Sequence, residues 1–486
     1  MPFKPVILWT DALIFLLVAA IAALAWTVRR DEHLRAPWAK VARSRSGMCA
    51  LVVLTAFVVT GLLDSLHYRP RLEGTGGAVN YGAEVRSAFD ALADGLRTRT
   101  ERTYSAPLAT HAFSRESIER AHGTQAREYP RLRHGGAHLE DPHGERWPDV
   151  GRKTLAGAGL ALALWTVLAM LLAALLAMRH REGIDGALSD LVHGCTEVPW
   201  RAMLLTAGAL LAVAGPVWVL AGSYHVLGTD KVGQDILYQT LKSIRTGLVI
   251  GTLTTLVMLP FAVILGLMAG YFRGWIDDLV QYVYTTLSSI PGVLLIASAV
   301  LLTQVWMDNR PELFETVSER ADVRLLFLCL ILGITGWTGL CRLLRGEALK
   351  LREADYVQAA RAFGVRDARI LTRHLLPNVM HIVLIAAVMD FSGLVLAEAV
   401  LSYIGVGVDP SMISFGTMIN NARLELAREP MVWWSLAAAF LFMFVLVLAA
   451  NLFSDAVRDA FDPRMRSSWA LPAALRPAQR LRAGSA

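Results

Sequence analysis

The chain has 486 residues, of which 55% are hydrophobic and 18% charged, and its formal net charge is +6. With a mean hydropathy of +0.45, it is too apolar and too weakly charged for an ordinary soluble globular protein. The positive charge gathers in short loops and in the C-terminal tail, a distribution that indicates membrane orientation rather than nucleic-acid binding.

Nine apolar runs reach the roughly 18 residues with which an α-helix crosses a bilayer. A backbone in lipid must satisfy its own hydrogen bonds, so each run is predicted to be a helix. We therefore expect an all-α polytopic membrane protein, with spans at Val6–Val28, Met48–Leu66, Leu155–Met178, Ala202–Gly222, Leu248–Tyr271, Leu279–Val305, Leu325–Leu344, Val379–Ile404 and Val432–Phe453.

Positive charge predicts how these spans are oriented. Basic residues concentrate in four segments: 29–45, 179–201, 342–373 and 458–482. Nine spans place all four on one side, which is the cytoplasm by the positive-inside rule, so the N-terminus is expected outside and the tail inside. The first span lacks a basic start and is followed by Arg29 and Arg30, so we expect a retained helix rather than a signal peptide.

Residues 67–154 form a long polar insert that the same count places outside. It has charges of both signs and scattered aromatic residues, and Phe89–Leu96 is predicted to begin a short helix. We expect a small, partly ordered domain that caps the external mouth and contacts another protein. Its size exceeds what a connection between two spans requires.

Metal binding by the insert is a weaker alternative. The four candidate ligands are His134, His138, Glu140 and His143. Gly135 and Gly136 interrupt the helical spacing that a metal pair would need, so a solvated histidine-rich loop is favoured and no metal site is predicted. The four cysteines of the chain show no disulfide framework and no zinc spacing.

A second polar motif follows the fourth span, where residues 225–235 read HVLGTDKVGQD. Gly228 and Gly233 permit tight turns, and Asp230 and Asp235 are predicted to cap helix starts. His225 and Thr229 complete this external signature.

The most informative segment lies between the seventh and eighth spans, where residues 355–378 read DYVQAARAFGVRDARILTRHLLPN. Its apolar stripe recurs at helical spacing and comprises Tyr356, Ala359, Ala360 and Phe363. Gly364 is predicted to end this helix in a left-handed turn, Asp367 to cap a second helix, and Pro377 to open the following span. The pattern predicts a helix–turn–helix knob, for which an ordinary amphipathic connector is the alternative.

Two acidic residues lie inside the eighth predicted span. Asp390 is roughly 18 Å beyond Asn378, near the middle of the membrane, and Glu398 is closer to the outer end. Charged groups at such depth are costly and commonly face a cavity or a partner. Either residue could line a translocation path, although helix packing is slightly favoured for Glu398.

These motifs, in this order, resemble the dipeptide and oligopeptide C-type permeases of ABC importers. The coupling motif of that family is matched by Gln358, Ala359, Ala360, Gly364, Leu376 and Pro377, with Gln358 in place of a consensus glutamate. Further matches lie at Ala269–Asp277, Leu401–Gly407 and Asn451–Arg464, and Arg43–Pro70 resembles the family's first span. The resemblance covers about half of the chain.

The resemblance implies a division of the chain around a type I importer core. Residues 1–66 hold two N-terminal spans, 67–154 the insert, and 155–223 two additional spans. Residues 224–464 then form the permease core with a coupling loop at 345–377, and residues 465–486 are a basic cytoplasmic tail.

The implied function is that of a permease subunit for di- or oligopeptides in the bacterial cytoplasmic membrane. The chain has no Walker A pattern and no catalytic motif, so we expect no enzymatic activity and no cofactor of its own, with ATP and Mg²⁺ on separate subunits. The expected partners are a related permease, two ABC ATPases, an extracytoplasmic binding protein and membrane lipid, but no nucleic acid. The insert is expected to contact the binding protein or the partner permease. Alternatives are an ion-driven transporter or channel, an importer of nickel or another non-peptide solute, and a membrane receptor.

Overall fold

The computed structural model describes residues 3–30, 32–72, 80–82, 84–119, 125–180, 183–194, 196–314 and 316–461. The predicted tail at 465–486 lies outside them. Within the described residues, eight helical runs are long and apolar enough to cross a membrane. They comprise α1 (Trp9–Arg30), α3 (Arg45–Asp64), α6 (Arg146–His180), α8 (Trp200–Ala221), α9 (Ile236–Phe272), α12 with α13 (Val317–Gly336 and Thr338–Arg352), α15 to α16 (Asp367–Ile370 and Leu376–Ile404) and α18 (Trp434–Phe461).

The remaining predicted span, Leu279–Val305, is not one continuous helix. Helix α10 (Gly274–Ser289) and helix α11 (Gly292–Asp308) meet at an angle of 89°. Pro291 lacks the N–H that would continue α10, and its ring disfavours helical geometry at Ile290, which adopts φ −87° and ψ 132°.

The broken pair still joins the two ends of the bundle. Arg273, just before α10, forms an ion pair with Glu353 at the end of α13. Val317, at the start of α12, lines a cavity together with Asp90 of the insert. The chain therefore passes from the end that holds the predicted coupling segment to the end that holds the insert, as a ninth crossing does.

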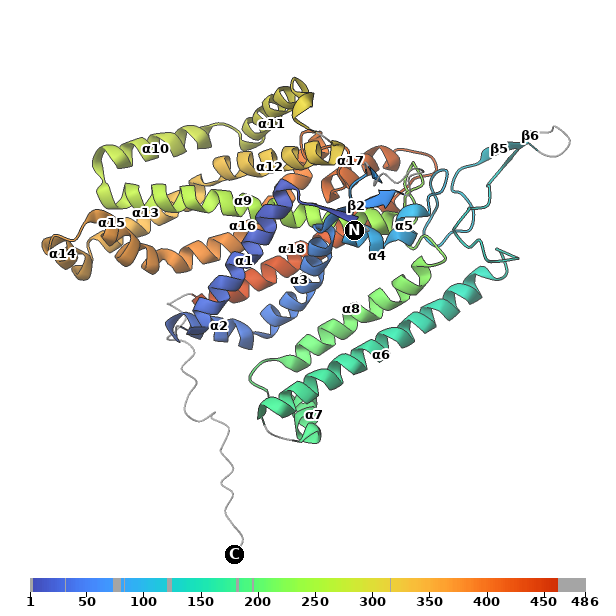
Figure 1. Cartoon of the computed structure of the whole chain (residues 1–486), viewed down its shortest axis with the longest axis horizontal. Coiled ribbons are helices and arrows are strands. Elements are labelled where there is room, and N and C mark those ends of the chain that lie inside the picture. Colours follow the sequence, from blue (N-terminus) through green and yellow to red (C-terminus); the bar gives the residue numbers. More distant parts are fainter. Residues whose placement is uncertain are drawn as a thin grey trace, which may run out of the picture.

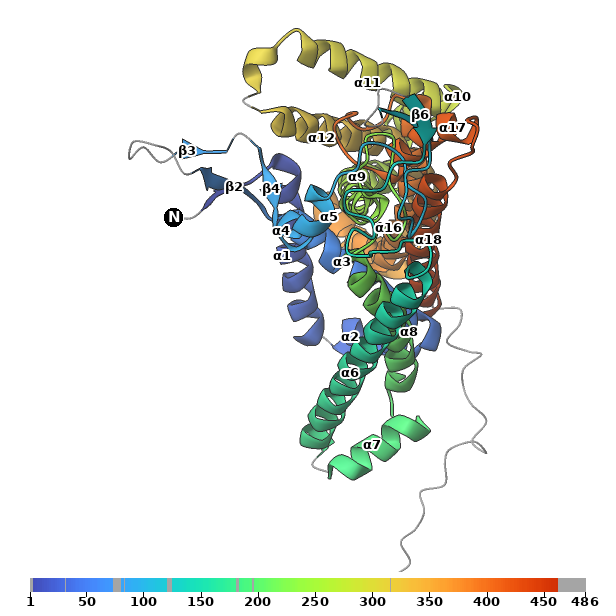
Figure 2. The same ribbon diagram turned by 90° about the vertical axis from the view of Figure 1, so that its right-hand side faces the viewer.

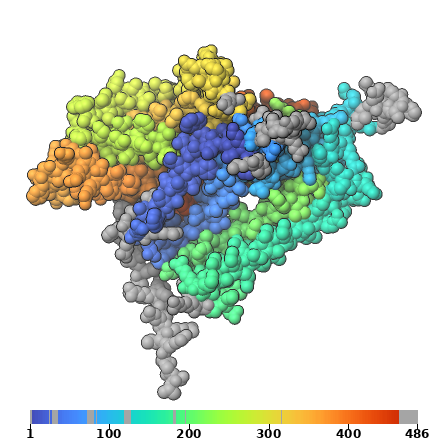
Figure 3. All heavy atoms as spheres, viewed as in Figure 1, coloured from blue at the N-terminus to red at the C-terminus, as the bar shows by residue number. Residues whose placement is uncertain are grey.

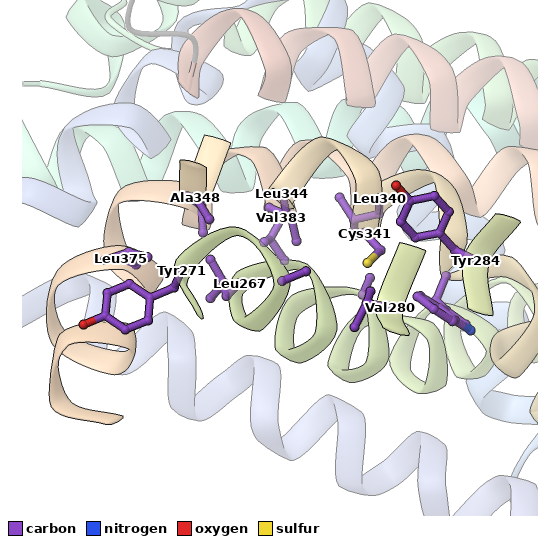
Figure 4. Close-up of a cluster of buried hydrophobic side chains, with 14 of the residues drawn as sticks. Leu267, Tyr271, Val280, Tyr284, Leu340, Cys341, Leu344, Ala348, Leu375 and Val383 are labelled. Atoms are coloured by element: carbon purple, nitrogen blue, oxygen red, sulfur yellow. The ribbon is translucent and has the colours of Figure 1, made fainter. Parts of the chain in front are cut away.

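Helix α9 lies at the centre of the bundle (Figure 1). Its 37 residues extend about 55 Å, and α3, α12, α13, α16 and α18 pack around it. Side chains of α9 contribute to three buried apolar clusters. The first is shared with α13 and α16, the second with α3 and α18, and the third with α12. Figure 4 shows the first cluster, in which Leu267 and Tyr271 of α9 pack with Leu344 and Ala348 of α13.

The two additional helices α6 and α8 form a hairpin that leaves the bundle on one side, while α10–α12 lie on the opposite side (Figures 1 and 2). The amphipathic helix α7 (Ile184–His193) joins them and packs Leu191 against α6. Trp165 of α6 donates to the carbonyl of Leu204 at 2.8 Å, and α8 packs on α3.

The N-terminal helix α1 is anchored by a buried ionic cluster. The Arg245 guanidinium of α9 lies 2.6 Å from the carboxylate of Asp11 and 3.7 Å from that of Asp322 in α12. The backbone N–H of Thr10 also donates to Asp322. Burying charges of both signs together offsets part of their desolvation cost. Because Asp11 has to stay beside Arg245, these contacts hold α1 in one position. Helix α2 (Glu32–Arg43) follows and packs on α18.

Small sheets at the end of the bundle that holds the insert accompany the helices, a feature absent from the sequence expectation. Strand β1 (Phe3–Val6) pairs antiparallel with β2 (His67–Leu72), which also pairs with β3 (Asn80–Tyr81) and β4 (Arg86–Ser87). Strands β5 (Glu116–Glu119) and β6 (Gln125–Glu128) form a hairpin. Because β1 precedes α1 and β2 follows α3, the start of the described chain lies at the same end as the insert.

The helix predicted at Phe89–Leu96 is interrupted at Ala93, giving α4 (Ala88–Leu92) and α5 (Asp94–Thr98). Ser87 and Asp90 form a capping box at the start of α4. The Asp90 carboxylate also accepts hydrogen bonds from Tyr238 at 2.7 Å and Lys242 at 2.5 Å, both on α9. The insert is therefore tied to the bundle.

Candidate functional site

The predicted coupling segment forms a knob at the end of the bundle remote from the insert (Figures 1 and 3). Helix α13 ends at Arg352, and α14 (Asp355–Ala362) follows. After a turn come α15 and a π-helical turn, Leu371–Leu375, which leads directly into α16. Leu376 and Pro377 open α16. Pro377 has no N–H to donate, and the π-helical turn directly before α16 is where the regular helical ladder is interrupted.

Three apolar side chains fix the knob to the bundle. Val357 of α14, Ile370 of α15 and Leu375 of the π-helical turn are fully buried in the cluster that α9 shares with α13 and α16. Because protein interiors are close-packed, a displacement of α14 is transmitted to these helices.

The predicted apolar stripe divides between two surfaces. Ala360 packs partly against the buried cluster, whereas Tyr356 and Ala359 are exposed and Phe363 is 86% exposed. The fully buried position of α14 is Val357, which is not part of the stripe. An exposed aromatic side chain beside a small alanine is typical of a protein contact surface.

Gly364 adopts φ +73°, the left-handed conformation that the sequence predicts for the end of α14. A Cβ atom at this position would meet no heavy atom within 4 Å, so backbone geometry rather than packing requires glycine. The prediction that Asp367 caps the second helix is wrong, because the residue that precedes α15 is Arg366. Asp367 instead accepts a hydrogen bond from the Tyr271 hydroxyl at 2.6 Å.

Gln358, which stands where the family motif has glutamate, turns back toward the bundle. Its amide donates to the carbonyl of Glu353 at 3.2 Å and lies 3.5 Å from the Glu353 carboxylate. His374 is half-buried, with its ring 6.3 Å from that of Tyr356. The knob therefore has no carboxylate at this position of α14.

The external signature is buried rather than presented to solvent. His225 lies between two carboxylates, 2.7 Å from Asp235 and 3.4 Å from Glu101 of the insert. Burial opposes its protonation, but hydrogen bonds to Asp235 and Glu101 raise the pKa of His225 to about 9. Asp235 also caps α9 by accepting from the N–H of Leu237 at 2.8 Å, as the spacing predicts.

Glu101 is the partner that sequence reasoning missed. Its carboxylate accepts the backbone N–H groups of residues 133–135 at 2.8–3.2 Å. Burial raises its pKa, but the hydrogen bonds from His225 and these amides outweigh burial and lower it to about 2. No local periodicity marks Glu101, because its partners lie far away in the sequence.

The glycines of the signature allow the insert to approach. Gly228 and Gly233 both have φ +76°, and a Cβ at Gly233 would lie 2.0 Å from the carbonyl oxygen of Glu101. Thr229 donates to the carbonyl of Thr103 at 2.9 Å. Asp230 does not cap a helix as predicted: it accepts from nearby backbone N–H groups and closes a turn.

Aromatic residues extend this contact into the bundle. The Tyr104 hydroxyl lies 3.3 Å from Glu425 of α17 (Phe415–Leu426), and the ring of Phe113 meets that of Trp434 of α18 edge to face at 4.8 Å. The inner face of the insert therefore covers the signature. The expected contact of the insert with a binding protein or partner permease could involve only its outer face.

The two intramembrane carboxylates occupy different environments. Glu398 is fully buried and accepts hydrogen bonds from Ser402 at 2.6 Å and Ser414 at 2.8 Å, so it links α16 to the start of α17. Asp390 is partly exposed, and no described residue hydrogen-bonds its carboxylate. This arrangement suits packing for Glu398 and leaves Asp390 available to line a path.

The described histidine side chains of the insert have separate partners and do not converge on one point. His138 contacts Asp149 and Lys153, each at 2.8 Å, and His143 stacks on His111 with ring centroids 5.3 Å apart. Across the described residues, no three histidine, cysteine, aspartate or glutamate side chains gather in a way that could hold a metal ion.

Comparison with known proteins gives one family and several relatives. A family model described as "Binding-protein-dependent transport system inner membrane component" matches residues 262–467. The oligopeptide transport system permease protein OppC of Mycobacterium bovis is 34% identical over 246 residues, 51% of this chain and 78% of that protein. The glutathione transport system permease protein GsiD of Pectobacterium atrosepticum is 32% identical over 50% of this chain and 74% of that protein. The dipeptide transport system permease protein DppC of Bacillus subtilis is 30% identical over 50% of this chain and 69% of that protein.

Proposed function

This chain belongs to the family of binding-protein-dependent transport system inner membrane components, and we propose that it is the permease subunit of an ATP-driven peptide importer. It is a multi-pass protein of the cytoplasmic membrane. Peptides are favoured as the substrate class because relatives are named as permeases for oligopeptides, dipeptides and glutathione. Nickel complexes or other non-peptide solutes are the alternative cargo.

The observation that carries the proposal is the knob built on α14. It exposes Phe363 while Val357, Ile370 and Leu375 bury its inner face against α9 and α13. A partner that grips the exposed face moves the central helices through this shared core. In the proposed cycle, ATP closes two ATPase subunits, the knobs move, and the bundle opens outward to receive substrate.

The proposed assembly contains this chain, a related permease, two ABC ATPases that bind ATP and Mg²⁺, and an extracytoplasmic binding protein, all in contact with membrane lipid. The N-terminus is outside and the tail cytoplasmic. The pairing of β1 with β2 supports this orientation, because it brings the start of α1 to the side of the insert. Asp390 is proposed to line the path between the two permeases.

Co-purification tests this assembly. The chain, expressed with the ATPase subunits and second permease from the same organism, is expected to retain the ATPases in detergent and to catalyse ATP-dependent dipeptide uptake in proteoliposomes. Uptake driven by an ion gradient without the ATPases would contradict the proposal.

A substitution at Glu398 separates the importer from an ion-driven transporter. Glu398→Gln is expected to keep ATP-dependent uptake within about twofold, because a glutamine carbonyl accepts hydrogen bonds from Ser402 and Ser414 as a carboxylate does. Glu398→Leu is the destabilising comparison, since it leaves buried hydroxyls unpaired at a cost of about 1–3 kcal/mol. Complete loss of uptake in a well-folded Glu398→Gln variant would favour the ion-driven alternative.

A further inference from the structure

We propose that a groove beside α14 receives a carboxylate side chain of the ATPase subunit and that Arg352 and Arg361 bind this carboxylate. The inference rests on the proposed function, because it takes the knob as the place where an ATPase docks. It adds a charge-recognition element that the motif resemblance does not contain.

The groove lies between the end of α9, the end of α13 and α14, and encloses about 420 Å³. Its polar lining comprises Tyr271, Arg352, Glu353, Gln358 and Arg361. The volume accommodates an incoming acidic side chain beside the exposed face of the knob. Positive charge in the loops places this end of the bundle in the cytoplasm, where the ATPase is.

The carboxylates of the groove are already engaged. Glu353 pairs with Arg273 at 2.9 Å, and Asp367, just beyond the groove, accepts from Tyr271 at 2.6 Å. These contacts leave the two lining arginines without an acidic partner among the residues that the structure describes.

Both arginines lack an ion pair with any described carboxylate. The Nη1 atom of Arg352 is buried and has no hydrogen-bond partner, and the Arg361 guanidinium lies 6.0 Å above the ring of Tyr271. A buried donor without an acceptor costs free energy that an incoming acceptor recovers. A carboxylate fits best, because its two oxygens match the planar donor fork of a guanidinium.

The occupant is assigned to the ATPase from the adjoining surface. Tyr356 of α14 and Phe363, which directly follows this helix, are both exposed, at 45% and 86%. Gln358 is neutral and adds no carboxylate to this surface. The positive charge of the groove comes from Arg352 and Arg361, so the matching group on the ATPase is acidic. Any protein that covers Phe363 lies within side-chain reach of the groove.

The test neutralises both arginines. Arg352→Gln combined with Arg361→Gln is expected to weaken binding of purified ATPase subunits to the permease complex in nanodiscs by about tenfold to a hundredfold. The salt dependence of binding should also become shallower, because fewer charges meet at the interface. Lys350→Gln is the matched control: it removes a cation at the same end that pairs with Glu347 at 3.0 Å, outside the groove, and should change binding less than about twofold.

The outcomes separate this inference from the proposed function. A wild-type complex that retains no ATPase refutes both. If the double variant binds the ATPase as tightly as the wild-type complex and with the same salt dependence, the role of the groove is refuted while the proposed function stands. Unchanged ATPase binding by the double variant, together with loss of anionic lipid that co-purifies with the wild-type complex, would assign the arginines to a lipid headgroup and also overturn the inference. If the double variant fails to fold, Arg361→Gln alone, at an exposed position, makes the same comparison.

Discussion

Glu101 connects the insert to the bundle through one buried carboxylate. It accepts three backbone N–H groups of the insert and faces His225 of the signature. His225 has a raised pKa and is protonated at neutral pH, so the contact is an ion pair supported by hydrogen bonds. Removing Glu101 leaves His225 with Asp235 alone, and removing His225 leaves both carboxylates buried without it, so each change is destabilising.

This pair predicts that the insert loosens in alkaline solution. The pKa of His225 is about 9 in the folded chain and about 6.5 when unfolded. Its stabilising contribution is therefore fully present below about pH 6.5 and is lost as the pH rises through about 9, with a maximum of roughly 3 kcal/mol. Thermal unfolding in nanodiscs between about pH 7 and pH 10 measures this loss.

The Glu101→Gln variant should be less stable at neutral pH and should lose part of the alkaline dependence, because Asp235, 2.7 Å from His225, still raises the pKa of that histidine. Glu116→Gln is the matched control, because that carboxylate forms only a partly exposed pair with Arg102 at 3.6 Å. An unchanged alkaline transition in Glu101→Gln would contradict the assignment.

At the scale of elements, α14 and its turn are predicted to be essential for transport but not for membrane insertion. Ala359→Trp places a bulky ring on the exposed face of the helix and blocks close approach of a partner. Gly364→Val forces a β-branched residue into φ +73°, at a cost of roughly 1–2 kcal/mol. Both variants are expected to lower ATP-dependent uptake at least about tenfold while reaching wild-type abundance in the membrane.

Gly346→Ala, in the middle of α13, is the control for the glycine. A Cβ there meets no atom within 4 Å, and alanine favours a helix, so uptake should be retained. Normal uptake by both knob variants would remove the coupling role from α14.

Local signals predicted the knob well, because the positive φ of Gly364 and the proline at the start of α16 depend only on neighbouring residues. The break between α10 and α11 was missed because averaged hydropathy treats Ile290 and Pro291 as two apolar residues, whereas their backbone preferences end a helix. The division of the α14 stripe was also missed, since spacing identifies an apolar face but not which edge of it another helix covers.

Contacts between distant segments could not be predicted at all. Arg245 meets Asp11, 234 residues away, and Tyr238 meets Asp90, 148 residues away. Nothing in the local pattern of either partner indicates the other. The sequence therefore predicts where the spans and motifs lie, while the docking of the insert over its own signature emerges only in three dimensions.

For the whole molecule, the arrangement predicts a nine-crossing topology. Reporter fusions after Arg30, Gly136, Arg181, Gly364 and Ala486 are expected to report inside, outside, inside, inside and inside, because each basic segment remains in the cytoplasm. The fusion at Gly136 is the most informative, since the insert covers the external signature. A cytoplasmic signal there would overturn the orientation of every helix that follows.

The buried cluster around Arg245 has a consequence for biosynthesis. Helix α1 leaves the ribosome early and carries Asp11, yet the arginine that neutralises this carboxylate is made 234 residues later. At ribosomal speeds of 5–20 residues per second, the delay is roughly 10–50 s. During that time Asp11 has only His67, which lies 2.7 Å from its carboxylate, as a partner, and the buried cluster that fixes α1 is complete only when α9 arrives. The first helix of the chain is thus among the last to reach its final place.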